Sequence, residues 1–300
     1  MFTSQDLSMI STPVLQVGYF DVGPRDAPVV LLLHGWPDDP RTWRQVAEAL
    51  VQSGRRVVAP YLRGFGPTRF RDHRRRTGDL VCLGADVLQL ADALKLENFA
   101  IIGHDWGARA AYIAACAEPR RATHLVALSV GWGTNSPDQK LSLVQAHNYW
   151  YHWLFALDRG EQFVRSERRA LTRYITDLWA VAARMSDERF DELCESFDNP
   201  DWADVVLHSY RVRWGLAEQD ADCIQMSDKI ASNPVIRVPT LVIHGGSDPC
   251  NDPATSEKRE ELFSGYYARE VISGAGHFPQ WETPEQCSNH ILEFLGRSFE

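Results

Sequence analysis

The sequence predicts an α/β protein whose central sheet is mostly parallel, is flanked by helices and is interrupted by an inserted helical cap domain. Two observations predict this fold class. Short apolar runs alternate with helical patterns through the first half of the chain, which is the element order of a doubly wound sheet. After a long stretch of helical periodicity without a convincing buried strand, the alternation resumes near Thr240. We therefore expect core residues 1–131, a cap at 132–232 and further core residues at 233–300.

Six short apolar runs are the expected strands of the core, because strands buried on both faces of a parallel sheet are continuously apolar. They are Val29–Leu33, Arg56–Pro60, Phe99–Ile102, Leu125–Val130, Thr240–His244 and Arg269–Ile272. Helices are expected to follow these strands. Several of the helices begin after a capping residue or have a proline in the first helical position. The expected helix starts are Pro40, Leu80, Trp106, Pro253 and Pro284.

Composition and charge narrow the class of partner. The 300 residues include 44% hydrophobic and 24% charged residues, as in ordinary globular proteins, and the formal net charge of −9 disfavours a nucleic-acid partner. No apolar stretch approaches the roughly 18 to 20 residues of a membrane span, and Met1 to Thr12 lacks the pattern of a signal peptide. We therefore expect a cytoplasmic protein that binds a small-molecule substrate, not a membrane, with a homodimer as its candidate assembly.

The cysteines and histidines give no sign of a metal site. The six cysteines stand singly, with no C-x-x-C spacing, and the ten histidines show no H-E-x-x-H pattern. We expect the cysteines to be reduced, structural residues. We also expect no metal and no other cofactor. The cysteines are Cys82, Cys116, Cys194, Cys223, Cys250 and Cys287.

The segment Gly103-His104-Asp105-Trp106-Gly107 lies between an expected strand and an expected helix. Glycines two residues before and after a central residue permit a sharp strand-to-helix turn, which exposes the central side chain at the carboxyl edge of the sheet. Here that residue is Asp105, and the N–H group of Trp106 lies at a helix N-terminus that favours negative charge. Asp is also a good helix N-cap, so a purely structural role for Asp105 is the alternative.

Three further motifs lie at strand ends on the same edge of the predicted sheet. They are the turn His34-Gly35-Trp36-Pro37, Asp248 after the strand ending at His244, and His277 after the last strand. Nucleophile, acid and histidine in this chain order are typical of one hydrolase architecture. Because Asp105, Asp248 and His277 then meet at one edge, a catalytic role for Asp105 is favoured over helix capping.

With these motifs in order, the sequence resembles the α/β-hydrolase family, in particular the aspartate-nucleophile branch of epoxide hydrolases and dehalogenases. The resemblance covers the whole chain and implies an α/β-hydrolase fold with a cap. It implies that Asp105 is the nucleophile and that His277, oriented by Asp248, is the general base. The N–H groups of Trp36 and Trp106 would form the oxyanion hole. A reused, inactive scaffold is disfavoured, because nucleophile and histidine are both present.

The cap indicates which leaving group is displaced. An epoxide oxygen leaves as a basic alkoxide and needs a proton donor such as tyrosine, whereas a halide needs only weak N–H donors. In the resemblance, Tyr151 and Tyr210 match the paired cap tyrosines of epoxide hydrolases, the second within Ser209-Tyr210-Arg211. The resemblance therefore favours an epoxide hydrolase that opens its substrate to a vicinal diol.

A hydrolytic dehalogenase with the same triad is the alternative. His152 and Trp153 with Tyr210 resemble the halide pocket of fluoroacetate dehalogenases, and Arg109 matches one of their two carboxylate-binding arginines. Trp106, Ser129 and Trp36 depart from the dehalogenase patterns, which keeps the epoxide interpretation ahead. The candidates for the substrate pocket are His34, Arg109, His152 and Trp153. If Arg109 points into the site, a substrate with a carboxylate becomes plausible.

Overall fold

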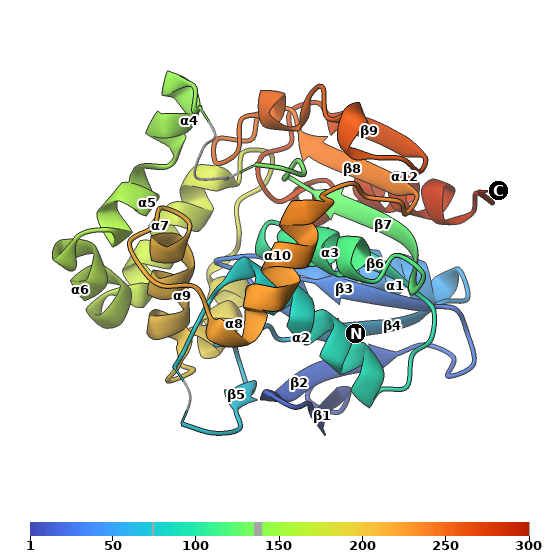
Figure 1. The fold of residues 1–300 in the computed structure, drawn as a ribbon, viewed down its shortest axis with the longest axis horizontal. Helices are drawn as coiled ribbons and strands as arrows, with labels where there is room; N and C mark the ends of the chain where they lie inside the picture. The colour runs from blue at the N-terminus through green and yellow to red at the C-terminus, as the bar shows by residue number, and fades with distance from the viewer. Residues whose placement is uncertain (74, 135–139, 300) are drawn as a thin grey trace.

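A computed structural model describes residues 1–73, 75–134 and 140–299. Among them, one sheet has the strand order β1-β2-β4-β3-β6-β7-β8-β9, and β5 pairs with β2. The strands from β4 to β9 in this order run parallel, which confirms the predicted mostly parallel α/β sheet (Figure 1). The strands are β1 (Leu7–Ser11), β2 (Leu15–Val22), β3 (Val29–Leu33), β4 (Arg56–Pro60), β5 (Arg69–Phe70), β6 (Phe99–His104), β7 (Ala122–Leu128), β8 (Thr240–Gly245) and β9 (Tyr267–Ile272).

The six predicted strands correspond to β3, β4, β6, β7, β8 and β9. The antiparallel strands β1, β2 and β5 lie outside the predicted set. β1 is half-exposed along its length, so its sequence lacks the continuous apolar run of a buried parallel strand. β5 has only two residues and therefore no readable pattern.

Helices cover both faces of the sheet. One face carries α2 (Leu80–Ala93), α3 (Trp106–Ala117) and α10 (Ile224–Ser232), which pack against one another (Figure 1). The helices α1 (Arg44–Gln52), α11 (Pro279–Glu282) and α12 (Pro284–Leu295) form a second packed group. The helix expected at Pro253 is wrong, because the chain makes only the short 3-10 turn Pro253–Ser256 there. Ser256 is the only buried residue of that turn, so it presents no apolar face that could stabilise a longer helix.

The helical insert lies beyond one end of the sheet (Figure 1). Its helices are α4 (Leu143–Asn148), α5 (Trp150–Phe155), α6 (Asp158–Ser166), α7 (Arg168–Trp179), α8 (Asp187–Phe197) and α9 (Trp202–Val212). After α9 the chain returns to the core, where α10 packs on α2 and α3. The domain boundaries at 131 and 232 stay predictions. None of the described helices is long and apolar enough to cross a membrane.

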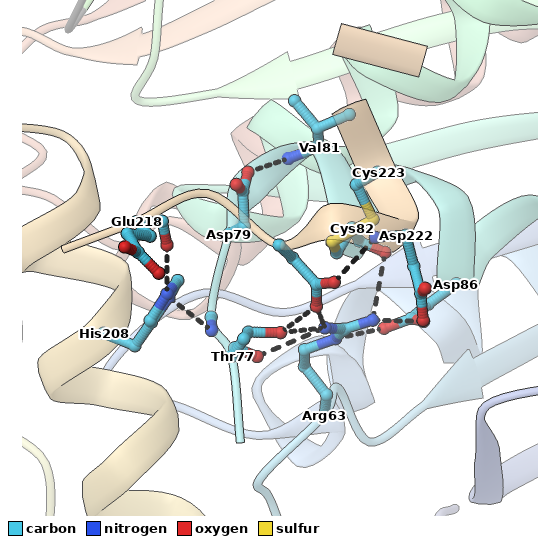
Figure 2. Close-up of a disulfide and its surroundings, with 12 residues drawn as sticks. Arg63, Thr77, Asp79, Val81, Cys82, Asp86, His208, Glu218, Asp222 and Cys223 are labelled. Carbon is cyan, nitrogen blue, oxygen red and sulfur yellow. Dashed lines mark hydrogen bonds and ion pairs between the residues drawn. A yellow bond between two sulfur atoms is a disulfide. The ribbon is translucent and has the colours of Figure 1, made fainter. Parts of the chain in front are cut away.

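A disulfide joins Cys82 on α2 to Cys223, so the prediction that all six cysteines are reduced is wrong for this pair (Figure 2). Cys223 ends the 3-10 turn Ala221–Cys223, which leads into α10. The two residues are 141 positions apart in sequence, but the return of the chain from the insert brings their Cα atoms to 5.6 Å. Single cysteines far apart in sequence carry no signal of such a meeting. Cys116, Cys194, Cys250 and Cys287 are free, and the last three are buried.

Candidate active site

Asp105 occupies a sharp turn between β6 and α3. Its backbone has φ 48° and ψ −111°, a left-handed conformation that non-glycine residues rarely adopt. Close packing enforces the turn, since a Cβ atom on Gly103 would lie 2.2 Å from the carbonyl oxygen of Gly107. Asp105 stands at the N-cap position of α3, but its side chain makes no capping hydrogen bond. The helix-capping alternative therefore does not explain this residue.

The Asp105 carboxylate is held by the loop that follows β3. The backbone N–H of Trp36 donates a hydrogen bond to its Oδ1 at 3.0 Å. The first N–H groups of α3, beginning at Trp106, lie at the positive end of the helix dipole. Asp105 is 6% exposed, so it meets a substrate away from bulk water.

His277 and Asp248 complete the group at the sheet edge. Nδ1 of His277 lies 2.8 Å from Oδ2 of Asp248, and Nε2 lies 3.9 Å from Oδ2 of Asp105. Nε2 is buried and makes no hydrogen bond to any described residue. Asp248 Oδ1 accepts hydrogen bonds from the N–H groups of Cys250 and Asn251 at 2.8 and 3.0 Å. The sequence-predicted triad is thus brought together, with the imidazole between the two carboxylates.

The backbone of His277 is fixed from three sides. Its carbonyl oxygen accepts from the Ser129 hydroxyl and lies 2.8 Å from Nε2 of His104, while its N–H donates to the Trp179 carbonyl. His104 therefore supports the histidine loop, as expected of a scaffold residue. His34 also has a scaffold position, because its ring nitrogens lie 2.9 Å from the Gly35 carbonyl oxygen and 3.0 Å from the N–H of Leu62.

The charges of the triad depend on one another. Burial disfavours protonation of His277, but the adjoining Asp248 carboxylate outweighs it and raises the histidine pKa well above its ordinary value. Burial would raise the pKa of Asp248, but His277 and the hydrogen bonds to the carboxylate hold it below its ordinary range. The two shifts together favour a protonated His277 beside an ionised Asp248.

Tyr151 and Tyr210 come from α5 and α9 of the cap and pack against Trp36, whose N–H binds the Asp105 carboxylate. The Tyr151 ring stacks on Trp36 with centroids 5.6 Å apart, and the Tyr210 ring meets the same indole edge-on at 5.3 Å. The two tyrosine rings are 5.3 Å apart. Burial raises the pKa of both phenols well above 10, with the Asp105 carboxylate adding to it, so both keep their protons at neutral pH. The structure thus brings together the predicted tyrosine pair.

His152 and Trp153 face opposite ways. His152 is buried 4.6 Å from the Tyr210 ring, and its Nδ1 accepts a hydrogen bond from the Trp214 indole at 3.1 Å. That bond leaves the proton of a neutral imidazole on Nε2, which has no described partner. Trp153 is 39% exposed and donates its indole N–H to the Ala146 carbonyl. Its N–H is therefore not directed at Asp105, in contrast to the role that a halide pocket would give it.

Two groups of potential metal ligands occur among the described residues. One contains Cys82 and Cys223, which are joined to each other as a disulfide and cannot act as thiolates. The other contains Asp248, Cys250 and His277, and here the carboxylate and the imidazole already bond each other. Both groups have a role in the fold or in the triad that needs no ion.

The comparisons with known proteins agree with this site. Residues 28–284 match the alpha/beta hydrolase fold family. The chain belongs to this family. It is 28% identical to Epoxide hydrolase A of Mycobacterium tuberculosis, over 96% of each chain, and 25% identical to human Epoxide hydrolase 4, over 94% of this chain and 76% of that protein. The crystal structure of a candidate epoxide hydrolase from Klebsiella pneumoniae is similar with a TM-score of 0.91 and 34% identity, over 97% of both chains.

The structure of this α/β-hydrolase places a residue that the sequence analysis did not name, Arg213, beside Tyr210. The residue expected beside Tyr210 is Arg211, but its guanidinium turns away to the Phe155 carbonyl and to Glu161. Arg213 lies over the Tyr210 ring instead, with its Cζ 4.6 Å from the centroid. The spacing of three residues on a helix places Arg213 and Tyr210 on one face, and that spacing is the signal that could have found it.

Proposed function

We propose that the protein hydrolyses epoxides to vicinal diols through a covalent ester on Asp105. One observation carries the proposal: the Asp105 carboxylate lies between the N–H of Trp36, on which both cap tyrosines pack, and Nε2 of His277. The names of the relatives are consistent with this activity.

In the first step, an Asp105 carboxylate oxygen attacks an epoxide carbon, and the carbon–oxygen bond of the ring breaks. The departing oxygen takes a proton from Tyr151 or Tyr210, which leaves a tyrosinate that solvent reprotonates. Because burial keeps both phenols protonated, a donor is present before the alkoxide forms. The product of this step is a hydroxyalkyl ester of Asp105.

In the second step, Nε2 of His277 takes a proton from water, and the resulting hydroxide attacks the Asp105 ester carbonyl. The tetrahedral oxyanion is stabilised by the N–H groups of Trp36 and Trp106. Its collapse breaks the ester carbon–oxygen bond, and the departing alkoxide takes the proton that His277 had removed from water. This releases the diol and restores the Asp105 carboxylate with one oxygen from water. Ester formation removes a negative charge 3.9 Å from Nε2 and lowers the His277 pKa, so the imidazolium releases its resting proton to solvent and the neutral imidazole can act as a base.

Trapping the ester tests this mechanism. His277→Gln should react once with an epoxide and gain the mass of one substrate, whereas Asp105→Asn should gain none at early times. Hydrolysis of the ester should slow by at least about 10³-fold, because general-base catalysis and water orientation are both lost. Peptide mapping should place the adduct on Asp105. An active enzyme whose His277→Gln variant forms no adduct would exclude the covalent route.

Epichlorohydrin separates the epoxide reaction from halide displacement, because it carries both leaving groups. Diol formation that precedes chloride release, and that is absent in Asp105→Asn, is the expected result. The outward position of the Trp153 indole supports this order, since a halide would lack that donor. Chloride released first would reassign the protein as a dehalogenase.

The small-molecule substrate follows from this chemistry, whereas the homodimer and the cytoplasmic location stay predictions. Sedimentation of the purified protein tests the first, and fractionation of producing cells tests the second. The Cys82–Cys223 disulfide is relevant to the location, because disulfides persist mainly in oxidising compartments.

A further inference from the structure

Cys250 is a buried thiol beside the triad, and the mechanism above gives it no role. Its Sγ lies 3.5 Å from the hydroxyl oxygen of Tyr151. The same sulfur, a carboxylate oxygen of Asp248 and a ring nitrogen of His277 lie within 4.8 Å of one another. Cys250 is 1% exposed, so these groups meet away from bulk water. The thiol is thus within reach of both the triad and one tyrosine of the cap.

The contact between the thiol and the phenol is fixed from both sides. The N–H of Cys250 donates to Oδ1 of Asp248 at 2.8 Å, and its carbonyl oxygen accepts from the Gln145 amide of α4 at 2.9 Å. The Tyr151 ring stacks on Trp36 and meets the Trp179 ring edge-on, with centroids 5.1 Å apart. Because packing holds both side chains, the fold itself keeps the sulfur beside the phenol oxygen.

The two cap tyrosines differ in the groups that can stabilise their ionised form. Burial raises the pKa of Tyr210, and the charge of Arg213, whose Cζ lies 4.6 Å from the ring centroid, opposes this shift. No described cation lies over the Tyr151 ring. Arg109, one turn along α3 from the nucleophile, donates instead to the carbonyl and hydroxyl oxygens of Thr134, both at 3.1 Å. Tyr151 therefore needs another source of stabilisation.

The surroundings of Cys250 determine the direction of its hydrogen bond. Burial raises the pKa of Cys250 despite the nearby charge of His277, so the thiol keeps its proton at neutral pH. The protonated imidazole can only donate, and both oxygens of Asp248 already accept N–H groups. The Tyr151 oxygen is left as the acceptor for the S–H group. A thiolate would raise the Tyr151 pKa further, whereas a thiol can donate to its oxygen.

We propose that Cys250 is a positioning residue for ring opening: its S–H donates to the Tyr151 oxygen, directs the phenolic proton at the epoxide and stabilises the tyrosinate. The proposal rests on the proposed function and specifies Tyr151 as the proton donor that Cys250 assists. As the bond from Asp105 to carbon forms and the ring carbon–oxygen bond breaks, the phenolic proton passes to the epoxide oxygen. The thiol keeps its own proton. A tyrosinate can only accept, so the S–H group faces it in this state whatever its direction at rest.

A double-mutant cycle tests whether Cys250 acts through Tyr151. The rate of ester formation on Asp105 is measured by rapid quench and mass spectrometry in a single turnover of 1,2-epoxyhexane or styrene oxide. Cys250→Ala should slow this step about 10-fold, because the tyrosinate loses a hydrogen bond. Cys250→Ser, which keeps a donor, should stay within about threefold of the native rate.

The two tyrosines provide the second half of the cycle. In the Tyr151→Phe protein, Cys250→Ala should change the rate of ester formation by less than about twofold, since the phenol it assists is gone. In the Tyr210→Phe protein, the loss of about 10-fold should remain. An equal loss in both backgrounds, or a Cys250→Ser variant as slow as Cys250→Ala, would assign Cys250 a packing role and overturn the proposal.

Cys287→Ala is the matched control, because Cys287 is also free and fully buried but lies on α12. It should leave the rate of ester formation within about twofold of the native value. Circular dichroism shows whether each variant is folded. Cys250→Val, which also lacks a donor, takes the place of Cys250→Ala if the alanine variant does not fold.

A readout without turnover separates this inference from the proposed function. Difluorotyrosine is placed at position 151 of the Asp105→Asn protein, whose neutral nucleophile resembles the ester, and its ionisation is followed by ¹⁹F NMR. Cys250→Ala should raise the pKa of this phenol, so that half-ionisation occurs about one pH unit higher, and Cys287→Ala should not. This shift in a protein that hydrolyses no epoxide would reject the proposed function and keep the hydrogen bond. An unchanged pKa would reject the hydrogen bond even in an active epoxide hydrolase.

Discussion

Arg63, in the loop after β4, and Arg213, directly after α9, both carry a guanidinium into the protein interior. Around Arg63, Asp86 and Thr77 satisfy the charge, and the Cys82–Cys223 disulfide ties the neighbouring segments together (Figure 2). Around Arg213, the described residues supply one hydroxyl, two aromatic rings and no carboxylate. The difference teaches that the first region is complete without a ligand. The second region has a buried positive charge that no carboxylate of the described residues pairs with.

The test with the largest expected effect on stability removes the guanidinium of Arg63 and that of Arg213 in separate variants. Arg63→Met should lower the free energy of unfolding by about 3–5 kcal/mol, because it leaves the Asp86 carboxylate buried without its partner. Arg213→Met should cost less than about 1 kcal/mol, because no described carboxylate is left behind. Urea unfolding followed by circular dichroism measures both variants.

The same measurement can contradict the comparison. A loss in Arg213→Met as large as that in Arg63→Met would mean that the protein itself compensates the Arg213 charge. Arg211→Gln serves as the control, because Arg211 lies in the last turn of α9, two residues before Arg213, and is partly exposed. Its ion pair with Glu161 should contribute about 1 kcal/mol or less.

The second test removes the Cys82–Cys223 disulfide, which lies in the region around Arg63. Replacing Cys82 and Cys223 together with serine should lower the free energy of unfolding by about 2–4 kcal/mol, because the disulfide closes a long loop in the unfolded chain. That loop spans 141 residues and contains both the nucleophile turn and the cap. Epoxide hydrolysis at 25 °C should remain within about twofold of the native rate.

Cys116→Ser is the matched control, because Cys116 is free and only partly buried. This variant should change the free energy of unfolding by no more than about 0.5 kcal/mol, as for surface substitutions in general. Its rate of epoxide hydrolysis should equal that of the native protein. The double serine variant could lose activity at a temperature where it stays folded. That result would mean that the Cys82–Cys223 disulfide positions the cap, and that the Arg63 and Arg213 regions are coupled.

The same contrast separates what the sequence could predict from what it could not. The parallel strands and the triad were predictable, because a buried strand is a continuous apolar run and a nucleophile turn needs glycines at fixed positions. The Cys82–Cys223 disulfide and the contact of Arg213 with Trp106 join segments from the core and from the end of the insert. Only tertiary packing brings such segments together, and no local sequence pattern predicts it.

The position of Trp153 shows the same limit within a single helix. The run from Trp150 to Phe155 is almost entirely aromatic, so its periodicity does not say which face is inward. In the structure, contacts of α5 with α6 and α9 bury Tyr151, His152 and Phe155 and leave Trp153 at the surface. Tertiary packing therefore decided which aromatic residues lie near the nucleophile.

The smallest expected effect concerns two adjacent aspartates after the Trp36 turn. Asp39 is satisfied by the Arg41 guanidinium and by the Ser196 hydroxyl, whereas Asp38 is 2% exposed and its Oδ2 has no described partner. Burial, with the adjacent Asp39 charge, raises the pKa of Asp38 to about 7. Asp38 thus belongs with the uncompensated charges, and Asp39 with the compensated ones.

The two aspartates should therefore respond to pH in different ways. Because the pKa of Asp38 is higher in the folded state, the folded protein keeps a proton that the unfolded chain releases, and the free energy of unfolding falls between about pH 4 and pH 7. Asp38→Asn removes this penalty, so its stability relative to the native protein should rise by about 1–3 kcal/mol from pH 4.5 to pH 8. Urea unfolding at the two pH values measures the gap. Asp39→Asn should instead lose stability at both, since it leaves Arg41 without its closest carboxylate. A gap between Asp38→Asn and the native protein that does not change with pH would mean that Asp38 is ionised throughout, and that Arg189 compensates it across the cap interface.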